Sequence, residues 1–378
     1  MNKRLAFNLL KYLLAISVLT YVVSSNWGPK GGTGLRYVWE NHVLTGGAGV
    51  HWDYLFYGFA LFAVGVVLTL VRWYLLVRCQ GLPLTLWNAI RLGMIGCFFN
   101  AFLPGSVGGD IIKAAALARE QSRRTVAVAT VIMDRVIGLW GLFWFVGLLG
   151  GVFWLTGQLE AEGPEGRSKR VIVITLAFLA VSVVVWLAMG FLTNERAEKF
   201  ALRLARIPKV GGSVAELWRA VWLYRCQPLY VCVSIMLSWL GFALFVPSFY
   251  FSALTLYSDE LGPMPTLQQH FILVPIGLII AAVPGFPGGA GISELGFDKL
   301  YELFKGTGSI GVMGSLVQRI IQWAIGLIGY VFYVAVPAGP VAGSLPPKKV
   351  AARQPAELPE ETAAQVWLPA PAEGTTAS

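Results

Sequence analysis

Long apolar runs, separated by short polar segments, make up most of the chain. Six of them are long enough to cross the hydrocarbon of a bilayer, which takes about 20 mostly apolar residues. These runs are Leu5–Val23, Tyr54–Val71, Thr125–Leu155, Val171–Leu192, Pro228–Tyr257 and Ser309–Val336. The first run follows Met-Asn-Lys-Arg and therefore also fits a signal peptide, but its cleavage signal around Ser24 is weak. We expect it to stay as an uncleaved span.

Two other segments, residues 85–124 and 262–308, have a different pattern. Each contains an apolar run, a Pro/Gly-rich break and a second, short helical run. Each must enter and leave the membrane on one side if the neighbouring spans are to alternate in direction. The pattern is typical of transporters whose interrupted helices lie near the bilayer midplane. We therefore expect an all-α polytopic membrane protein with about six full transmembrane helices plus two oppositely oriented re-entrant broken-helix hairpins.

The composition agrees with this architecture and excludes several classes of protein. Of the 378 residues, 56% are hydrophobic and only 13% are charged, whereas a soluble globular chain carries about 25% charged residues. A disordered chain, a collagen-like chain and a water-soluble enzyme are thereby excluded. The net charge of +9 is typical of basic cytoplasmic loops, so we expect no nucleic-acid partner.

The distribution of Lys and Arg predicts the orientation. Most basic residues outside the apolar runs lie at the N-terminus, around residues 72–78, 113–124 and 193–226, and in the tail. The alternate segments carry far fewer basic residues. Because cytoplasmic loops are enriched in Lys and Arg, both termini are expected in the cytoplasm of a multi-pass protein of the cell membrane. Arg72 and Arg78, which follow the second span, are expected to be loop charges.

Two regions outside the spans have distinctive compositions. Segment 193–226 is basic and mixed with apolar residues, which fits amphipathic helices on the cytoplasmic surface and equally an ordinary basic loop. From residue 338 to 378 the chain is rich in Pro, Ala, Glu and Thr, so it cannot bury a core and we expect it to be disordered. The expected organisation is a membrane domain over residues 1–337 and a cytoplasmic tail over residues 338–378.

The two breaks resemble each other in sequence. In each, a Pro-Gly pair is followed by a Gly-Gly pair and then by an acidic residue that begins a new apolar run. The break residues are Asn100, Pro104, Gly105, Gly108 and Gly109, and then Pro284, Gly285, Pro287, Gly288, Gly289 and Gly291. Exposed backbone at membrane depth persists only where it is packed in protein or lines a wet cavity. The helix start that follows presents free N–H groups suited to a phosphate.

Charged residues also occur within or beside the apolar runs. A charge in the middle of a membrane helix costs about 2.5–3.5 kcal/mol on insertion scales, so such residues usually face a partner or a cavity. We expect a headgroup-binding polar cluster formed by Asp110, Lys113, Asp134, Arg135, Glu294 and Arg319. The cations would hold a phosphate and the acids would balance them. The alternative is that these residues pair only to fix helix packing. For Asp110 and Lys113, which we expect near the cytoplasmic surface, the two interpretations are equally supported.

Catalytic and cofactor-binding motifs do not stand out. The chain has no nucleophile elbow, no H-E-x-x-H and no phosphate-binding loop, so we expect no ATP hydrolysis. The four cysteines form no C-x-x-C pair and only three histidines are present, which predicts no metal site and no cofactor. His270, at the mouth of the second hairpin, is interpreted as an interface residue.

Taken together, three motifs resemble the transmembrane region of lysylphosphatidylglycerol synthases, a family often called flippase-like. They are Leu103–Asp110, Asp134–Gly138 and Pro284–Glu294, in the same order within residues 5–337. The resemblance implies a bundle with two re-entrant hairpins that binds or moves an anionic lipid headgroup, with Asp110, Asp134, Arg135 and Glu294 as the carried-over polar positions. Lys113 stands where many relatives have Arg, which keeps the charge but loses the planar fork, so headgroup specificity need not follow the family. We expect the soluble aminoacyl-transferring domain of full-length synthases to be absent.

The leading hypothesis is a lipid flippase-like protein that translocates an anionic phospholipid or a polyprenyl-phosphate-linked precursor without ATP. The first alternative is an integral transferase acting on a lipid-linked sugar, with Asp110 or Glu294 as acid or base. The second is a membrane adaptor that docks a cytoplasmic enzyme through segment 193–226. Expected partners are membrane lipids, and a second copy of the chain or a separate cytoplasmic enzyme is also considered. Among these hypotheses we favour a protein that is not an enzyme.

Overall fold

A computed structural model describes residues 3–28, 34–45, 49–102, 108–121, 123–156, 167–208, 211–283 and 286–335 of the chain. Within this part of the chain the regular elements are all helices. Five helices are long and apolar enough to cross a membrane: α3 (Trp52–Cys79), α6 (Arg124–Leu155), α7 (Arg167–Gly190), α10 (Pro228–Leu254) and α13 (Gly308–Ala335). They match five of the six expected spans. The chain is therefore an all-α polytopic membrane protein, as its sequence predicts.

The remaining expected span corresponds to α1 (Lys3–Ser25), in which Leu13–Ser25 counts as a shorter apolar helix. It packs against α12 (Ile292–Leu303). After it come a short helix, α2 (Leu35–Val38), and a π-helical turn, η1 (Trp39–Val43). The expected tail at residues 338–378 lies outside the described residues.

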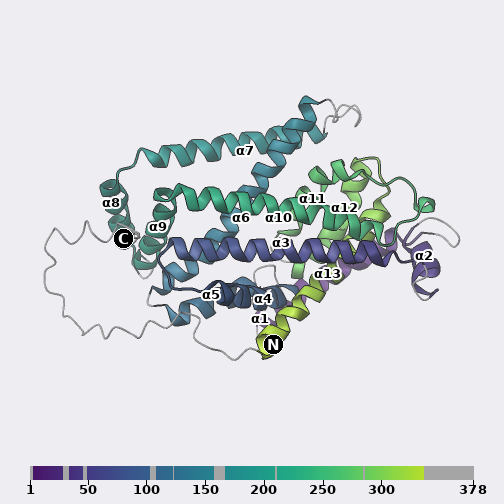
Figure 1. Cartoon of the computed structure of the whole chain (residues 1–378), viewed down its shortest axis with the longest axis horizontal. Helices are drawn as coiled ribbons and strands as arrows, with labels where there is room; N and C mark the ends of the chain where they lie inside the picture. The colour runs from purple at the N-terminus through teal and green to yellow at the C-terminus, as the bar shows by residue number, and fades with distance from the viewer. Residues whose placement is uncertain are drawn as a thin grey trace, which may run out of the picture. The chain divides into compact units, whose positions relative to one another are not determined.

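Helices α3 and α10 form an antiparallel pair at the centre of the bundle (Figure 1). At one end the His51 N–H donates to the Thr255 carbonyl oxygen at 3.0 Å. Further along, the Ser248 hydroxyl donates to the Gly58 carbonyl oxygen at 2.8 Å. Hydrogen bonds of this kind hold two helices together where no water competes for the polar groups. The pair gives the bundle two distinct ends, the C-terminal end of α3 and the C-terminal end of α10.

The first hairpin consists of α4 (Leu86–Phe102) and α5 (Gly108–Glu120). The Gln121 side chain at its exit donates to the Pro83 carbonyl oxygen at its entrance, at 2.9 Å. Arg123 donates to the Gln80 carbonyl oxygen at 3.4 Å, directly after α3. This hairpin therefore enters and leaves at the C-terminal end of α3.

The second hairpin consists of α11 (Leu267–Ala281), the 3₁₀ turn η3 (Pro287–Gly289) and α12. Its entrance and exit meet where the Thr307 N–H donates to the Pro263 carbonyl oxygen at 2.9 Å. The Tyr257 hydroxyl, just after α10, donates to the Gly262 carbonyl oxygen at 3.1 Å. This hairpin starts at the C-terminal end of α10, so the two hairpins enter from opposite ends of the antiparallel pair (Figure 1).

The two hairpins belong to two structural repeats of opposite direction. Each repeat is a long helix, two short helices joined by a break, and a second long helix: α3 to α6, and α10 to α13. The hairpins pack across the repeats, with α4 against α13 and α11 against α6. Inverted repeats with interrupted helices commonly place a binding site at the repeat interface. The candidate binding site is therefore the region where the two breaks approach each other.

The basic segment 193–226 forms two helices, α8 (Asn194–Ala205) and α9 (Gly211–Cys226). The Thr193 hydroxyl caps α8 by accepting from the Arg196 N–H. The two helices are joined by an ion pair between Glu198 and Arg219. The Tyr224 hydroxyl donates to the Leu76 carbonyl oxygen at 3.0 Å, which fixes α9 to the end of α3. This segment is therefore an ordered part of the bundle, at the end where the first hairpin enters.

Candidate functional site between the hairpins

The structure groups the six expected polar residues into two clusters. The first polar cluster consists of Asp110, Lys113, Asp134 and Arg135, joined by Arg72 of α3. The second polar cluster consists of Glu294 and Arg319, joined by the hydroxyls of Ser293 and Ser315.

Asp134 occupies the centre of the first polar cluster. Its Oδ1 accepts from Arg72 Nε at 2.9 Å, and its Oδ2 lies 3.6 Å from Lys113 Nζ. Arg72 also donates to the Ser238 hydroxyl of α10 at 2.9 Å. The Lys113 ammonium lies 4.2 Å from the centre of the Trp73 ring, a position that favours a cation over an aromatic face. All three charged side chains are buried, and together they fasten α3, α5, α6 and α10.

Arg135 forms the more exposed ion pair of the same cluster. Its Nε lies 2.5 Å from Asp110 Oδ2, and its side chain keeps 52% of its surface exposed, against 10% for Asp110. The sequence suggests that Asp110 and Lys113 lie near the cytoplasmic surface. In the structure both side chains are buried. They belong to the first two turns of α5, at the inner end of the hairpin, because the chain has already reached its deepest point when α5 begins.

A close approach of backbones holds the first hairpin together. The Gly109 N–H donates to the Asn100 side-chain oxygen at 2.8 Å. A Cβ on Gly109 would lie only 1.9 Å from the Gly96 carbonyl oxygen, so only glycine fits there. Glycine at such positions lets two helices touch through their backbones. Gly108 and Gly109 therefore belong to the first turn of α5 and not to an irregular loop.

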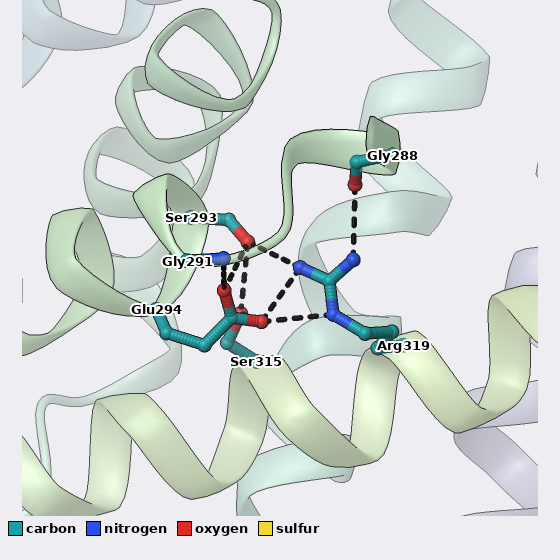
Figure 2. A network of polar contacts seen from close by, with 6 residues as sticks. All are labelled: Gly288, Gly291, Ser293, Glu294, Ser315 and Arg319. Carbon is teal, nitrogen blue, oxygen red and sulfur yellow. Dashed lines mark hydrogen bonds and ion pairs between the residues drawn. The ribbon is translucent and has the colours of Figure 1, made fainter. Parts of the chain in front are cut away.

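The second polar cluster is buried and fully paired (Figure 2). Glu294 Oε1 accepts from Arg319 Nε at 2.9 Å and from Nη2 at 2.6 Å. Its Oε2 accepts from the Gly291 N–H at 2.7 Å and from the Ser293 hydroxyl at 3.0 Å. Arg319 also donates to the Gly288 carbonyl oxygen at 3.0 Å. A buried ion pair is tolerated when further hydrogen bonds satisfy the remaining donors and acceptors, and this arrangement ties the second break to α13.

The two ion pairs occupy equivalent places in the two repeats. Asp110 is the third residue of α5 and Glu294 is the third residue of α12. Each acid pairs with an arginine 25 residues further along the chain, Arg135 in α6 and Arg319 in α13. The repeats are thus equivalent in chemistry as well as in helix order.

Two neighbouring cavities lie beside the first hairpin, and the second of them also reaches the second hairpin. One of about 190 Å³ is lined by the first polar cluster and by residues of α3 and α4. The other, of about 330 Å³, is lined by both Arg135 and Arg319. Asn100 lines both cavities, and a Cβ on Gly288 would lie 3.7 Å from both the Asn100 carbonyl oxygen and Arg319 Nη1. The two hairpins therefore meet. Arg135 of α6 and Arg319 of α13 line the same cavity beside them.

The second break contains three glycines with left-handed backbone conformations. Gly288, Gly289 and Gly291 have φ angles of 55°, 72° and 84°, which favour glycine because it lacks a Cβ. Pro287 begins η3. The expected break residues Pro104, Gly105, Pro284 and Gly285 lie outside the described residues.

The sequence interpretation missed the role of Arg72. From the sequence, Arg72 is expected to be a loop charge, because it follows Val71, the last residue of the expected span. The signal that points to its burial is the apolar stretch Trp73–Val77, which extends the same helix by more than a turn. Gly138 is a second signal, because a Cβ there would lie 3.0 Å from the Arg72 guanidinium. The hydroxyls of Ser293 and Ser315 were also missed, and nothing in their spacing singles them out.

Comparisons with known proteins agree with this architecture. The family description "Lysylphosphatidylglycerol synthase TM region" matches residues 44–329. A UPF0104 membrane protein from Pyrococcus horikoshii is 22% identical over 294 residues, covering 71% of this chain and 83% of the relative. No solved structure matches the chain. Because the family match spans most of the chain and includes both hairpins, the protein belongs to the family of the lysylphosphatidylglycerol synthase transmembrane region.

Proposed function

We propose that this protein binds the phosphate of an anionic lipid headgroup in the cavity between the hairpins and moves the lipid between leaflets without ATP hydrolysis. The observation that carries the proposal is that Arg135 and Arg319, one from each inverted repeat, line the same cavity of about 330 Å³. Arginine binds phosphate through a planar fork of N–H groups. A headgroup bound at Arg135 would also lie against the part of the cavity wall that Arg319 and Gly288 of the second repeat form.

Arg135 is the residue best placed to receive the phosphate. Half of its side chain is exposed, and it faces both cavities. A phosphate competes with the Asp110 carboxylate for the same guanidinium, so binding exchanges one charge-assisted pair for another. Arg319 is buried and fully paired, and its contribution is to fix the Gly288 backbone at the cavity wall.

The charges of the two clusters match a ligand with a single negative charge. The first polar cluster contains three cations (Arg72, Lys113 and Arg135) and two carboxylates (Asp110 and Asp134), which leaves one excess positive charge. The second cluster, with Glu294 and Arg319, is neutral. A phosphodiester carries a single negative charge and would balance this excess. The family description names a phospholipid product, which supports the same chemical class of ligand.

The test is lipid transport by the purified protein in liposomes. Liposomes of phosphatidylcholine with a trace of fluorescent phosphatidylglycerol are treated with an impermeant quencher, and the protected fraction is followed over time. We expect the protein to make both leaflets accessible. The Arg135→Gln variant should lower the rate at least tenfold, because it removes the exposed cation while the glutamine amide can still donate to the buried Asp110 carboxylate.

The matched control is Arg206→Gln, which removes an exposed arginine outside the site, in the turn after α8. Its rate should equal that of the unmodified protein. Equal rates for Arg135→Gln and the unmodified protein would contradict the assignment of the site. A new covalent lipid product, detected by mass spectrometry, would favour the transferase alternative over transport.

A further inference from the structure

A second, apolar site lies on the far side of α6 from the polar clusters. It is a groove of about 550 Å³ between α6, α7, α9 and α10, called the lateral groove below. Met133 and Ile137 of α6 line it, whereas Asp134 and Arg135, between them in sequence, line the cavities near the hairpins. The lateral groove is therefore separate from the headgroup site.

The lateral groove opens to the outside of the bundle. Val136 on α6 and Val181 and Val185 on α7 line it, yet they remain 50%, 62% and 55% exposed. Helix α7 contacts α6 through the Trp140–Ser182 hydrogen bond and the Phe143–Phe178 ring pair, and it lies apart from α10 (Figure 1). An open apolar groove on a membrane helix bundle faces hydrocarbon, and packing contacts favour its filling by a chain of matching chemistry.

The length of the lateral groove matches one leaflet. Its lining on α7 extends from Phe178 to Met189, which at about 1.5 Å per residue is roughly 17 Å. Half of the hydrocarbon core is about 15 Å thick. The inner end is closed by the rings of Phe143 and Phe178, whose centres lie 4.5 Å apart. A transmembrane helix of another protein would need a groove of twice this depth, whereas an acyl chain of one leaflet fits it.

The other end of the lateral groove carries a cation at headgroup level. Arg225, in the last turn of α9, donates from Nε to the Trp186 carbonyl oxygen at 3.2 Å and lies 5.4 Å from the Trp186 ring centre. Trp186 lines the groove. Within the described part of the chain no carboxylate lies within ion-pair distance of Arg225. Gly190 leaves room for this guanidinium, because a Cβ there would lie 2.2 Å from Arg225 Nη2.

From this geometry we infer that the lateral groove binds a phospholipid of the leaflet on the α8–α9 side, with an acyl chain between α6 and α7 and the phosphate at Arg225. Trp186 stands between the two parts of the lipid, at the depth where indole rings favour the membrane interface. The bound lipid would fill the space between α7 and the bundle, which the protein itself leaves open.

The experiment uses the full chain in liposomes that contain a phosphatidylglycerol with a photoactivatable group in its acyl chain. After illumination, labelled peptides are identified by mass spectrometry. We expect labelling to concentrate on the α6 and α7 residues that line the groove. The Val185→Trp variant should reduce this labelling at least fivefold, because the indole fills the groove. Val184→Trp is the matched control, since Val184 is 64% exposed but does not line the groove, and its labelling should be unchanged.

The phosphate contact is tested with a photoactivatable diacylglycerol, which has the same chains and no phosphate. The unmodified protein should be labelled several-fold more by the phospholipid than by the diacylglycerol, and Arg225→Gln should abolish that preference. Equal labelling of the Val184→Trp and Val185→Trp variants would overturn the proposal. So would labelling spread evenly over all lipid-facing helices, or a groove filled by α7 of a second copy, seen as dimers when a protein–protein cross-linker is added.

Discussion

Arg72 and Asp134 form an ion pair at the centre of contacts that join four helices, α3, α5, α6 and α10. Arg72 also bonds to Ser238, and Asp134 also faces Lys113. Removing one partner of such a pair leaves the other buried and uncompensated, which typically costs about 3–5 kcal/mol. The pair is therefore a structural link as well as part of the first polar cluster.

The Arg72→Leu variant should consequently be destabilised by about 3–5 kcal/mol, since Asp134 loses its closest cation. The measurement is thermal unfolding of the detergent-purified protein, followed by intrinsic fluorescence. Arg78→Leu serves as the control, because Arg78 lies on the same helix but is exposed. If both variants unfold at the same temperature as the unmodified protein, the pair does not stabilise the fold.

At the residue scale, the sequence predicts which charges are buried better than it predicts their partners. Asp134, Arg135 and Arg319 lie within long apolar runs, and the cost of a charge in hydrocarbon already places them at a site. Which residues they pair with depends on how distant helices pack together, and a local sequence pattern does not reveal that packing. The equal spacing of 25 residues between Asp110 and Arg135 and between Glu294 and Arg319 is a signal in the sequence that would have given both pairs.

At the scale of elements, the hairpins depend on how closely their two helices approach each other. Gly109 and Gly96 touch backbone to backbone, and Asn100 closes the tip by accepting from the Gly109 N–H. Because Asp110 follows Gly109, the same contact sets the position of the Asp110–Arg135 pair. A larger residue in this contact should therefore affect both stability and transport.

The Gly109→Ala variant should lose about 1–3 kcal/mol of stability, as expected for overpacking. It should also lose most of its lipid transport. Both quantities can be measured on one preparation, by thermal unfolding and by the liposome assay. Gly151→Ala provides the comparison, because a Cβ on Gly151 of α6 has open space around it. In that helix the change should be neutral or stabilising by up to about 1 kcal/mol. Equal behaviour of the two variants would show that the contact is not needed.

The lengths of the elements follow from the sequence with some exceptions. Apolar runs gave the long helices, but α3 continues past Arg72 to Cys79 and begins two residues before Tyr54. The charged residues Arg72 and Arg78 do not stop α3, which ends before Gly81, a glycine with a φ of 69°. Segment 193–226 forms helices because Trp218 and Arg219 of α9 bond to α8, and such contacts between helices are not apparent from composition.

At the scale of the whole molecule, the sequence predicts two opposed hairpins but not that they meet. The contact between Gly288 and Asn100 joins residues almost two hundred positions apart. It depends on the packing of α4 against α13 and of α11 against α6. Such packing between distant helices is determined by the complementary shapes of their surfaces. The structure supplies this contact, on which the proposed headgroup site depends.

Arg78, Arg123 and the basic residues of α8 and α9 lie at the end of the bundle where the first hairpin enters. We expect this end to face the cytoplasm, because basic loops remain on that side. In a background whose four natural cysteines are replaced by alanine, an impermeant maleimide should label Asp259→Cys in intact cells. It should label Arg206→Cys only after the membrane is opened. The reverse pattern would invert the orientation and place both termini outside.

The pairing of α3 with distant helices also has a consequence for the order of events during synthesis. Arg72 reaches the membrane 62 residues ahead of Asp134 and 166 residues ahead of Ser238. At about 5–20 residues per second, its first partner follows after roughly 3–12 s and its second after roughly 8–33 s. During that interval α3 carries an unneutralised guanidinium. The nascent chain therefore needs either a delayed release of α3 into lipid or a temporary anionic partner from the insertion machinery or the bilayer.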